Sequence, residues 1–427
     1  MTASIFLLLL ALFLMNMPMA VAIGAATMGA FALTGDSSLM LVAQRMYAGT
    51  DSFPLMAVPL FMIAGQLMEA GGISRRIIDF ANSLVGWLPG GLAAVAIVSA
   101  MFFGGISGSA AADTAAVGGM LIPAMIRSGY SPGFAGAVQA TGGSIGVIIP
   151  PSIPMIIFGF LTGASIGKLF AAGILPGLLM GLSLILMTVI LSKRGGFQDS
   201  GGGHFSVAEV WHCARRAGWA LGAPAIILGG ILGGIFTATE SAAVAVFYAL
   251  FVGLFIYRQL KFSDLPGIFL NASVTSAVIM FIIAQATAFS WYLTIREVPA
   301  LISGTVLALT DDPVLLLLLI NLILLVAGTF IETTAALILF VPVIVPMLPA
   351  LGIDLIHLGA IVVVNLSIGM LTPPLGICLI VSCGLAGTRL GDISTRVLPF
   401  LLILLVDLLL VTYWPPLTSW LPALLAS

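Results

Sequence analysis

Long apolar stretches, separated by short polar or glycine-rich segments, follow one another along nearly the whole chain. Many of these stretches approach or exceed the roughly 20 residues that an α-helix needs to cross a bilayer. The sequence does not show the short segments of alternating apolar and polar residues that are typical of an outer-membrane β-barrel. The pattern therefore predicts an all-α polytopic membrane protein.

Composition narrows the class of protein further. The chain has 427 residues, of which 61% are hydrophobic and 7% charged, whereas a typical soluble domain carries about 25% charged residues. The net charge of −2 gives no attraction for nucleic acid. The three cysteines and three histidines form no paired-cysteine or zinc motif, and no catalytic cluster is visible. We therefore expect a protein of the lipid bilayer that is not an enzyme and binds no nucleic acid.

The N-terminal apolar stretch, residues 4–34, could be either membrane structure or a signal peptide. Ala20-Val21-Ala22 is similar to a signal-peptidase site, but no Lys or Arg precedes it, as a signal peptide requires. We therefore expect 4–34 to remain in the membrane. Asn16 and Pro18 predict a division into two short spans, whereas a single span would place the N-terminus on the opposite side of the membrane.

An internal repeat relates two halves of the chain at a constant offset of 223 residues. Chance matches of glycine and leucine are common in an apolar chain, but a shared offset for longer motifs and prolines is not. The offset pairs Ser144-Ile145-Gly146 with Ser367-Ile368-Gly369, Pro150-Pro151 with Pro373-Pro374, Pro123 with Pro346 and Pro176 with Pro399. The sequence therefore predicts two copies of one structural unit.

Each copy has the same order of segments: a span, an amphipathic arm, two apolar half-lengths that meet at a polar tip, an interrupted helix and a last span. Each half-length is too short to cross alone, so a re-entrant helical hairpin is expected. The predicted parts are N-terminal scaffold spans, 1–52; a first repeat, 53–192, with hairpin 91–125, broken helix 133–162 and span 169–191; a polar loop, 193–216, and a helical pair, together 193–264; and a second repeat, 265–427, with hairpin 313–348, broken helix 357–383 and last span 395–412.

The two copies are expected to face opposite ways across the membrane. Five crossings separate the start of one copy from the start of the next, and an odd number inverts the second copy. If loop 193–216 is cytoplasmic, only Arg45, Lys168 and Arg296 among the 14 basic residues lie outside, as the positive-inside rule favours. The first hairpin then opens from the cytoplasm and the second from the outside.

The hairpin tips carry the residues with candidate chemistry. The first tip contains Ser107 and Ser109 and is followed by Asp113, and the second contains Glu332, Thr333 and Thr334. Helix ends carry unpaired backbone groups, so an N-terminal end favours an anion and a C-terminal end a cation. Hydroxyl and carbonyl oxygens are hard ligands that suit an alkali cation. The tips therefore predict ion and substrate sites near the middle of the membrane.

The interrupted helices supply the opposite wall of these sites. Proline removes an N–H donor and disfavours a continuous helix, so Pro150-Pro151 and Pro373-Pro374 free backbone carbonyls upstream. Two inverted copies would hold two cations, with a substrate between them. The alternative is a plain helix kink packed against its neighbours.

Four isolated acidic residues each have two interpretations. Glu332 either takes part in coupling or substrate gating, or is a helix cap or a water-facing charge. Asp113 either is a ligand or caps a half-helix. Glu240 is expected to belong to an outward-facing N-cap cluster rather than to a functional site. Asp407 is expected to meet a partner subunit or a polar residue of the bundle. No nucleotide-binding motif appears, so an ion gradient is the expected energy source.

The motifs together resemble the large membrane subunit, DctM-like, of tripartite ATP-independent periplasmic transporters. The matching segments are Phe-Pro-Leu-Met-Ala-Val-Pro-Leu-Phe-Met-Ile-Ala-Gly at 53–65, Gly-Gly-Ile-Ser-Gly-Ser-Ala at 104–110, Ile-Ile-Pro-Pro-Ser-Ile at 148–153, Glu-Thr-Thr-Ala-Ala at 332–336 and Leu-Thr-Pro-Pro-Leu-Gly at 371–376. The resemblance covers essentially the whole chain.

The resemblance implies a sodium-driven secondary transporter of the bacterial inner membrane that imports organic acids such as dicarboxylates, sialic acid or sugar acids. It implies an elevator-type fold, Na⁺ as coupling ion with no other cofactor, a separate small subunit with four spans, and a periplasmic solute-binding protein. The implied sodium ligands are Ser107, Ser109, Gly142, Ile145 and Gly146 in one site, and Gly328, Asn365, Ile368, Gly369 and Thr372 in the other. Substrate is expected to contact Ser109, Asp113, Pro151, Glu332, Thr333, Thr334 and Pro374.

Three further points are left open by the residues of the chain. Ile149 stands where the second copy has Thr372, which puts equal strength of the two sites in doubt. A stand-alone sodium-coupled carboxylate symporter without a binding protein is the main alternative, and a channel or membrane enzyme is a weaker one. The identity of the substrate is not encoded in any motif of the chain.

Overall fold

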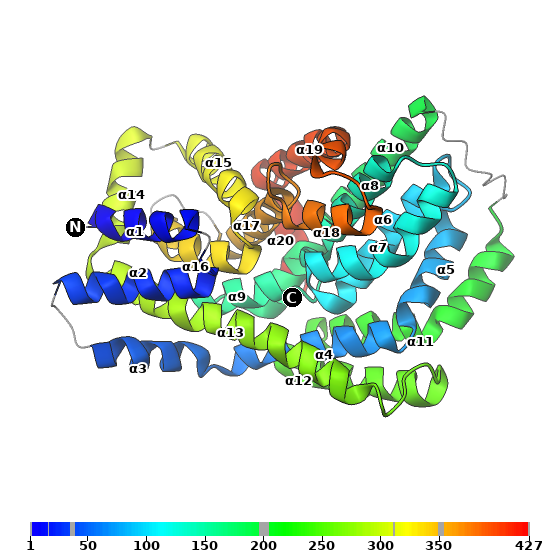
Figure 1. Ribbon diagram of the computed structural model, residues 1–427, viewed down its shortest axis with the longest axis horizontal. Helices are drawn as coiled ribbons and strands as arrows, with labels where there is room; N and C mark the ends of the chain where they lie inside the picture. Colours follow the sequence, from blue (N-terminus) through cyan, green and yellow to red (C-terminus); the bar gives the residue numbers. More distant parts are fainter. Residues whose placement is uncertain are drawn as a thin grey trace.

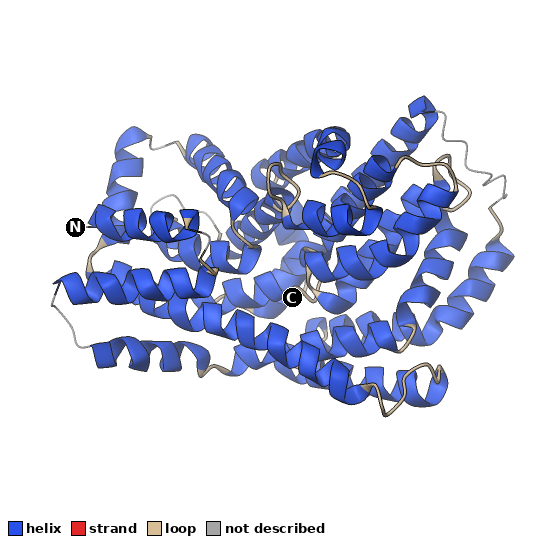
Figure 2. Cartoon of the chain, in the orientation of Figure 1, coloured by secondary structure: helices blue, strands red, loops and turns tan. Residues whose placement is uncertain are grey.

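The computed structural model describes residues 2–15, 17–34, 39–195, 205–310, 312–348 and 354–425. In these ranges every regular element is a helix (Figure 2). The predicted all-α membrane architecture is therefore confirmed. The N-terminal stretch forms two helices, as predicted, with Pro18 just before the second; Asn16 lies outside the described residues. These helices and the next are α1 Thr2–Leu14, α2 Met19–Thr34 and α3 Leu39–Thr50.

The two repeats contain equivalent helices in the same order, and α14 to α19 begin within about two residues of the positions that the offset of 223 gives from α5 to α10, whereas α13 begins well before the equivalent of η1. The first copy comprises η1 Phe53–Met56, α4 Ala57–Ala70, α5 Ile73–Val85, α6 Gly91–Ser107, α7 Ala110–Arg127, α8 Pro132–Ser144, η2 Ile145–Val147, α9 Ile153–Thr162 and α10 Ile166–Gly195. The second comprises α13 Leu265–Ile295, α14 Val298–Leu309, α15 Pro313–Phe330, α16 Thr333–Ile344, η4 Val345–Met347, α17 Leu355–Gly369, α18 Ile377–Ala386, α19 Leu390–Tyr413 and α20 Pro416–Leu424.

The connection between the repeats is more helical than expected. Helix α10 continues to Gly195, and α11, Val207–Leu232, begins well before residue 216, because Ser206 caps its N-terminus by accepting a hydrogen bond from the Glu209 N–H. The polar loop predicted at 193–216 is therefore too long. Helix α12, Ala238–Phe251, continues into a π turn, η3 Val252–Ile256, and begins with a capping box between Thr237 and Glu240. The predicted N-cap role of Glu240 is confirmed.

The hairpin helices are longer than predicted. Helices α6 and α15 have 17 and 18 residues. By length and composition α15 could cross a membrane, as could η1–α4, α10, α12–η3, α13 and α19. The expectation that each half was too short to cross alone is thus wrong for α15. The hairpins are recognised instead by their tips, which line the same cavity, as described below.

Both broken helices are interrupted where the prolines predict. Helix α8 ends at Ser144 and, after one 3₁₀ turn, α9 begins only at Ile153; α17 ends at Gly369 and α18 begins at Ile377. Each Pro-Pro pair lies in the gap. A plain kink in a continuous helix is therefore excluded in both copies.

The helices form an elongated body in which the second halves of the broken helices are exchanged between repeats (Figure 1). Helix α9 of the first copy packs against α16 of the second hairpin, and α18 of the second copy packs against α7 and α8 of the first. The long helix α13 packs against α2, α3 and α4 along one side of the molecule. This exchange brings the tips and interruptions of both copies together.

Candidate functional site

The tip of the first hairpin is held against the first broken helix. Gly108 ends α6 with a φ of 62°, a conformation that favours glycine, and a Cβ atom there would lie 2.7 Å from the Pro151 carbonyl oxygen. Ser109 then begins α7 without making a side-chain cap. The tip therefore depends on a glycine for both its turn and its contact with the Pro-Pro segment.

Asp113 is enclosed between this hairpin and the broken helix. It is fully buried, and its Oδ1 accepts a hydrogen bond from Ser107 Oγ. Its Oδ2 has no hydrogen-bond partner among the described residues. A Cβ atom at Gly146 would lie 1.7 Å from this Oδ2, and one at Gly104 would lie 3.3 Å from it. The carboxylate thus occupies the space left by two glycines, and its free oxygen needs a cation or a proton.

Gly104 and Gly146 also bring two backbones together. A Cβ atom at Gly104 would lie 2.5 Å from the Gly146 Cα atom. Ser107, Asp113 and Gly146 therefore meet around one small space, the first candidate ion site. Gly142 lies one turn before Gly146, where a Cβ atom would lie 3.3 Å from the Ile97 Cα atom of α6, and Ile145 is fully buried in the same turn. Their contribution to an ion site would come from backbone carbonyls.

The second candidate ion site has the same backbone arrangement. A Cβ atom at Gly369 would lie 2.7 Å from the Gly328 Cα atom, so α15 and α17 touch without intervening side chains. Asn365 lies one turn before Gly369 and is fully buried. Its Oδ1 has no hydrogen-bond partner among the described residues. Each copy thus places one unpaired side-chain oxygen beside the meeting point of its hairpin and broken helix.

The second site lies closer to open space than the first. Thr372, whose hydroxyl donates to the Ile368 carbonyl at 3.0 Å, lines a cavity of about 180 Å³ together with Ile368 and Thr329. Gly328 and Thr329 also line a cavity of about 260 Å³ that reaches Glu332. Ile149 stands at the position of Thr372 in the first copy. The first copy therefore lacks the side-chain oxygen that Thr372 offers in the second.

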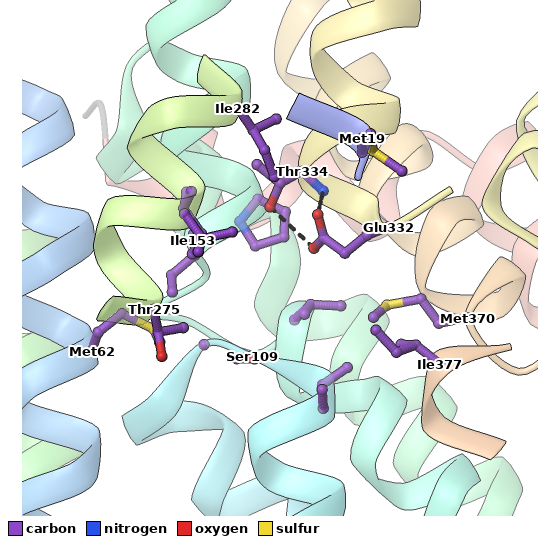
Figure 3. A pocket seen from close by; sticks show the side chains of 17 residues that line it. Met19, Met62, Ser109, Ile153, Thr275, Ile282, Glu332, Thr334, Met370 and Ile377 are labelled. Carbon is purple, nitrogen blue, oxygen red and sulfur yellow. Dashed lines mark hydrogen bonds between the residues drawn. The ribbon is translucent and has the colours of Figure 1, made fainter. Parts of the chain in front are cut away.

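The two hairpin tips line one cavity of about 270 Å³ (Figure 3). Ser109 approaches it from the first tip, and Glu332 and Thr334 approach it from the second. Met19 of α2 and Thr275 of α13 also line it. Most of the lining is apolar, and its polar side chains are Ser109, Glu332 and Thr334 of the two tips and Thr275 of α13. A small molecule with one apolar body and one or two polar ends fits this lining.

Glu332 serves as the N-cap of α16. Its carboxylate accepts hydrogen bonds from the Thr334 N–H at 2.9 Å and from the Thr334 hydroxyl at 3.1 Å (Figure 3). The capping interpretation of Glu332 is therefore correct, while the carboxylate still lines the cavity. Ser109 occupies the equivalent position in the first copy but leaves the α7 N-terminus without a side-chain cap.

The remaining predicted substrate residues lie away from the cavity. The Thr333 hydroxyl is buried against Met370 Sδ at 3.0 Å. Asp113 is buried behind the first tip, and Pro151 is buried beside Gly108, whereas Pro374 is exposed. Asp407 accepts a hydrogen bond from Ser183 of α10 at 2.5 Å, so it meets a polar residue of the bundle, as one interpretation predicted.

Sequence reasoning missed Asn321 and Thr412. Asn365 Nδ2 donates to the Asn321 backbone carbonyl at 2.9 Å and to its Oδ1 at 2.8 Å, and Asn321 Nδ2 donates to Thr412 Oγ1 at 2.9 Å. The signal was present, since Asn321 is a lone amide in the run Leu-Leu-Ile-Asn-Leu-Ile-Leu at 318–324. Polar groups at membrane depth are rare and often functional.

The family description "Tripartite ATP-independent periplasmic transporter, DctM component" matches residues 6–417. The chain belongs to this family. The resemblance drawn from the motifs is therefore confirmed.

Three relatives illustrate the range of the family. The chain is 42% identical to the isethionate TRAP transporter permease protein DctMQ of Oleidesulfovibrio alaskensis, over 95% of this chain but 64% of that protein, and so spans somewhat less than two thirds of it. It is 41% identical to the C4-dicarboxylate TRAP transporter large permease protein DctM of Pseudomonas aeruginosa, over 91% of each chain. It is 40% identical to the 2,3-diketo-L-gulonate TRAP transporter large permease protein YiaN of Escherichia coli, over 89% of each chain.

These relatives are transporter permeases and not enzymes, in agreement with the prediction from the sequence. Among solved structures, the YdaH transporter of Alcanivorax borkumensis, described as having an unusual topology, matches with a TM-score of 0.57 and 18% identity over 90% of each chain. That likeness concerns the fold alone.

Proposed function

We propose that this DctM-family chain is the large permease of a sodium-driven importer of small organic acids in a bacterial inner membrane. A periplasmic solute-binding protein would deliver the substrate, and a small membrane subunit with four spans would pack against the chain. The observation that carries the proposal is the pair of buried, unpaired side-chain oxygens, Asp113 Oδ2 and Asn365 Oδ1, each beside the contact of a hairpin and a broken helix.

A cation would bind at each of these oxygens, and backbone carbonyls at the interrupted helix ends would complete each site. Burial makes an unpaired carboxylate costly, by several kcal/mol even after relaxation, so a bound Na⁺ stabilises the site by supplying the missing charge. The amide oxygen of Asn365 would contribute a dipole to the second ion. Sodium binding would thereby fix both hairpins against their broken helices.

The substrate would occupy the cavity between the tips. Three relatives transport isethionate, a C4-dicarboxylate and 2,3-diketo-L-gulonate, as their names state, and all three are small organic anions. The uncapped N–H groups at the start of α7, next to Ser109, suit one anionic end of such a molecule. The capped α16 would contribute the Thr334 hydroxyl.

The mechanism would be an elevator movement. Both ion sites lie among the hairpins and broken helices, whose half-helices are exchanged between repeats, and the cavity lies between these elements and α2, α4 and α13. These elements are expected to move together past α13 and its neighbours α2, α3 and α4, carrying ions and substrate across in one step.

The test is uptake by proteoliposomes that contain the chain with its small subunit and its binding protein. Substrate uptake should require an inward sodium gradient and should stop when a sodium ionophore dissipates the gradient. Uptake that is unchanged by the ionophore would refute sodium coupling. Uptake that is unchanged when the binding protein is omitted would favour a stand-alone symporter instead.

A further inference from the structure

A buried chain of hydrogen bonds runs from the second candidate ion site to the last spanning helix. The Asn365 amide donates to Asn321, Asn321 donates to Thr412, and the Thr412 hydroxyl donates to the Leu408 carbonyl at 2.7 Å. All three side chains are at most 3% exposed. The chain connects α17, α15 and α19.

The carbonyl groups at the two ends fix the direction of every hydrogen bond in this chain. Backbone carbonyls can only accept, so the Thr412 proton points to Leu408 and the Asn365 NH₂ group points to the Asn321 carbonyl. Thr412 Oγ1 is then left as an acceptor, which directs Asn321 Nδ2 toward it and Asn321 Oδ1 toward Asn365. With its NH₂ group held in this way, the Asn365 amide must present Oδ1 on its free side.

The first repeat shows that the fold does not require this chain of hydrogen bonds. At the offset of 223 residues, Asn321 corresponds to Val98, Asn365 to Gly142 and Thr412 to Val189. None of these has a side chain that forms hydrogen bonds, and yet the equivalent helices form and pack in the same order. Three buried polar residues in one copy alone therefore point to a role other than building the repeat.

We propose that Asn321 is a positioning residue for the second sodium site: with Thr412 behind it, it holds the Asn365 amide so that Oδ1 faces the ion. This inference rests on the proposed sodium coupling. Asn321 acts through Asn365, because Asn321 and Thr412 donate or accept hydrogen bonds within this buried network and need not touch the ion. Without these side chains the backbone carbonyl of residue 321 is, among the described residues, the one acceptor left to hold the Asn365 amide, and an amide that turns its NH₂ group to the site would repel a cation.

The experiment measures the sodium concentration that gives half-maximal uptake by the reconstituted complex. Asn321→Leu removes the side-chain acceptor of the Asn365 amide at similar side-chain size and leaves only the backbone carbonyl of residue 321, and we expect about a ten-fold increase in half-saturating sodium. Thr412→Val removes one hydroxyl further away, and we expect about a three-fold increase. Thr412→Ser retains the hydroxyl and should stay within about two-fold of the unsubstituted protein. The substrate KM at saturating sodium should not change in any of them.

Thr188→Val is the matched control. Thr188 lies in α10, the last span of the first repeat, is fully buried, and donates to the Leu184 carbonyl four residues earlier at 2.7 Å, as Thr412 does to Leu408. Its loss should leave half-saturating sodium unchanged. If Thr188→Val and Thr412→Val shift it equally, the role of Thr412 is structural and the proposal is overturned.

Two further outcomes separate the inference from the function on which it rests. Sodium-independent uptake by the unsubstituted complex would refute sodium coupling itself. If uptake is sodium-dependent and Asn365→Leu raises half-saturating sodium, but Asn321→Leu and Thr412→Val do not, the positioning role alone is overturned. Should Asn321→Leu fail to assemble, the contrast between Thr412→Val and Thr412→Ser decides the question.

Discussion

The two candidate ion sites have the same backbone geometry but different side chains. In the first, the hairpin supplies the carboxylate of Asp113, and the equivalent position of the second hairpin is Ala336. In the second site, the broken helix supplies the amide of Asn365, and the equivalent position of the first broken helix is Gly142. A repeated fold therefore provides two candidate places for a cation, but it does not make them equal.

The difference in charge has an energetic consequence. A buried charge without a partner costs several kcal/mol, whereas a buried unpaired amide oxygen costs about 1–3 kcal/mol. A cation at the first site would relieve the larger penalty. We therefore expect the first site to bind sodium more tightly and to be occupied before the second.

The largest effect is expected for Asp113→Asn. The change removes the buried charge, so the complex without sodium should melt several degrees higher, while uptake should fall at least ten-fold. Sodium should also stabilise the variant less, because a ligand stabilises only the states that it binds. Thermal unfolding with and without sodium, together with uptake, measures these effects. Asp79→Asn, at an exposed position of α5, is the control; a higher melting temperature there too would contradict the explanation.

The glycine contacts provide a second comparison. Gly369→Ala would place a Cβ atom against the backbone of Gly328, which cannot move aside as a side chain could, and should raise half-saturating sodium about ten-fold. Gly119→Ala in α7 is the control, because a Cβ atom there has no other atom within 4 Å. It should leave transport unchanged and slightly stabilise the helix. Equal sodium curves for both variants would show that close backbone contact is not needed at the second site.

A smaller effect is expected at the tip of the second hairpin. Glu332→Gln keeps an oxygen that can cap α16 but removes a negative charge from the cavity wall, so an anionic substrate should show a KM lowered by about two- to five-fold. Half-saturating sodium should stay the same. Initial rates over a range of substrate concentrations at saturating sodium measure the change. A raised KM would indicate that the carboxylate itself contacts the substrate.

The smallest effect on transport is expected for Ser183→Ala. This serine donates a hydrogen bond to Asp407 between α10 and α19, and neither residue lines the cavity beside Thr372. Its loss should reduce thermal stability by about 1–3 kcal/mol, because a buried acceptor is left without its partner. Sodium dependence should remain as in the unsubstituted protein, and any shift would place Asp407 in the ion pathway.

Much of the fold could be predicted from the glycine, proline and polar residues that interrupt the apolar stretches of the sequence. The offset of 223, the Pro-Pro pairs and the tip residues located the hairpins and the interruptions, because glycine and proline act on the backbone locally. The capping motif at Thr237 and Glu240 was readable for the same reason. Hairpin lengths were underestimated, since the helices extend into the polar tips, where Ser107 still belongs to α6.

The site was predicted less completely because its contacts join distant segments. The Asn321–Asn365 hydrogen bonds link residues 44 positions apart, and the Asn321–Thr412 bond spans 91. No local pattern reveals that Asp113 points into the gap left by Gly146 rather than toward the substrate cavity. Such features depend on how helices from the two copies pack, and the sequence of one copy does not contain that information.

The exchange of α9 and α18 has a consequence for the history of such a chain. Helix α9 packs on α16, and α18 packs on α7 and α8, so a chain of half this length would leave each exchanged helix without its packing surface. A shorter ancestor would have needed a second copy of itself, inserted the other way up, to cover that surface. Gene duplication and fusion would then have preserved an antiparallel dimer within a single polypeptide, after which each half was free to diverge.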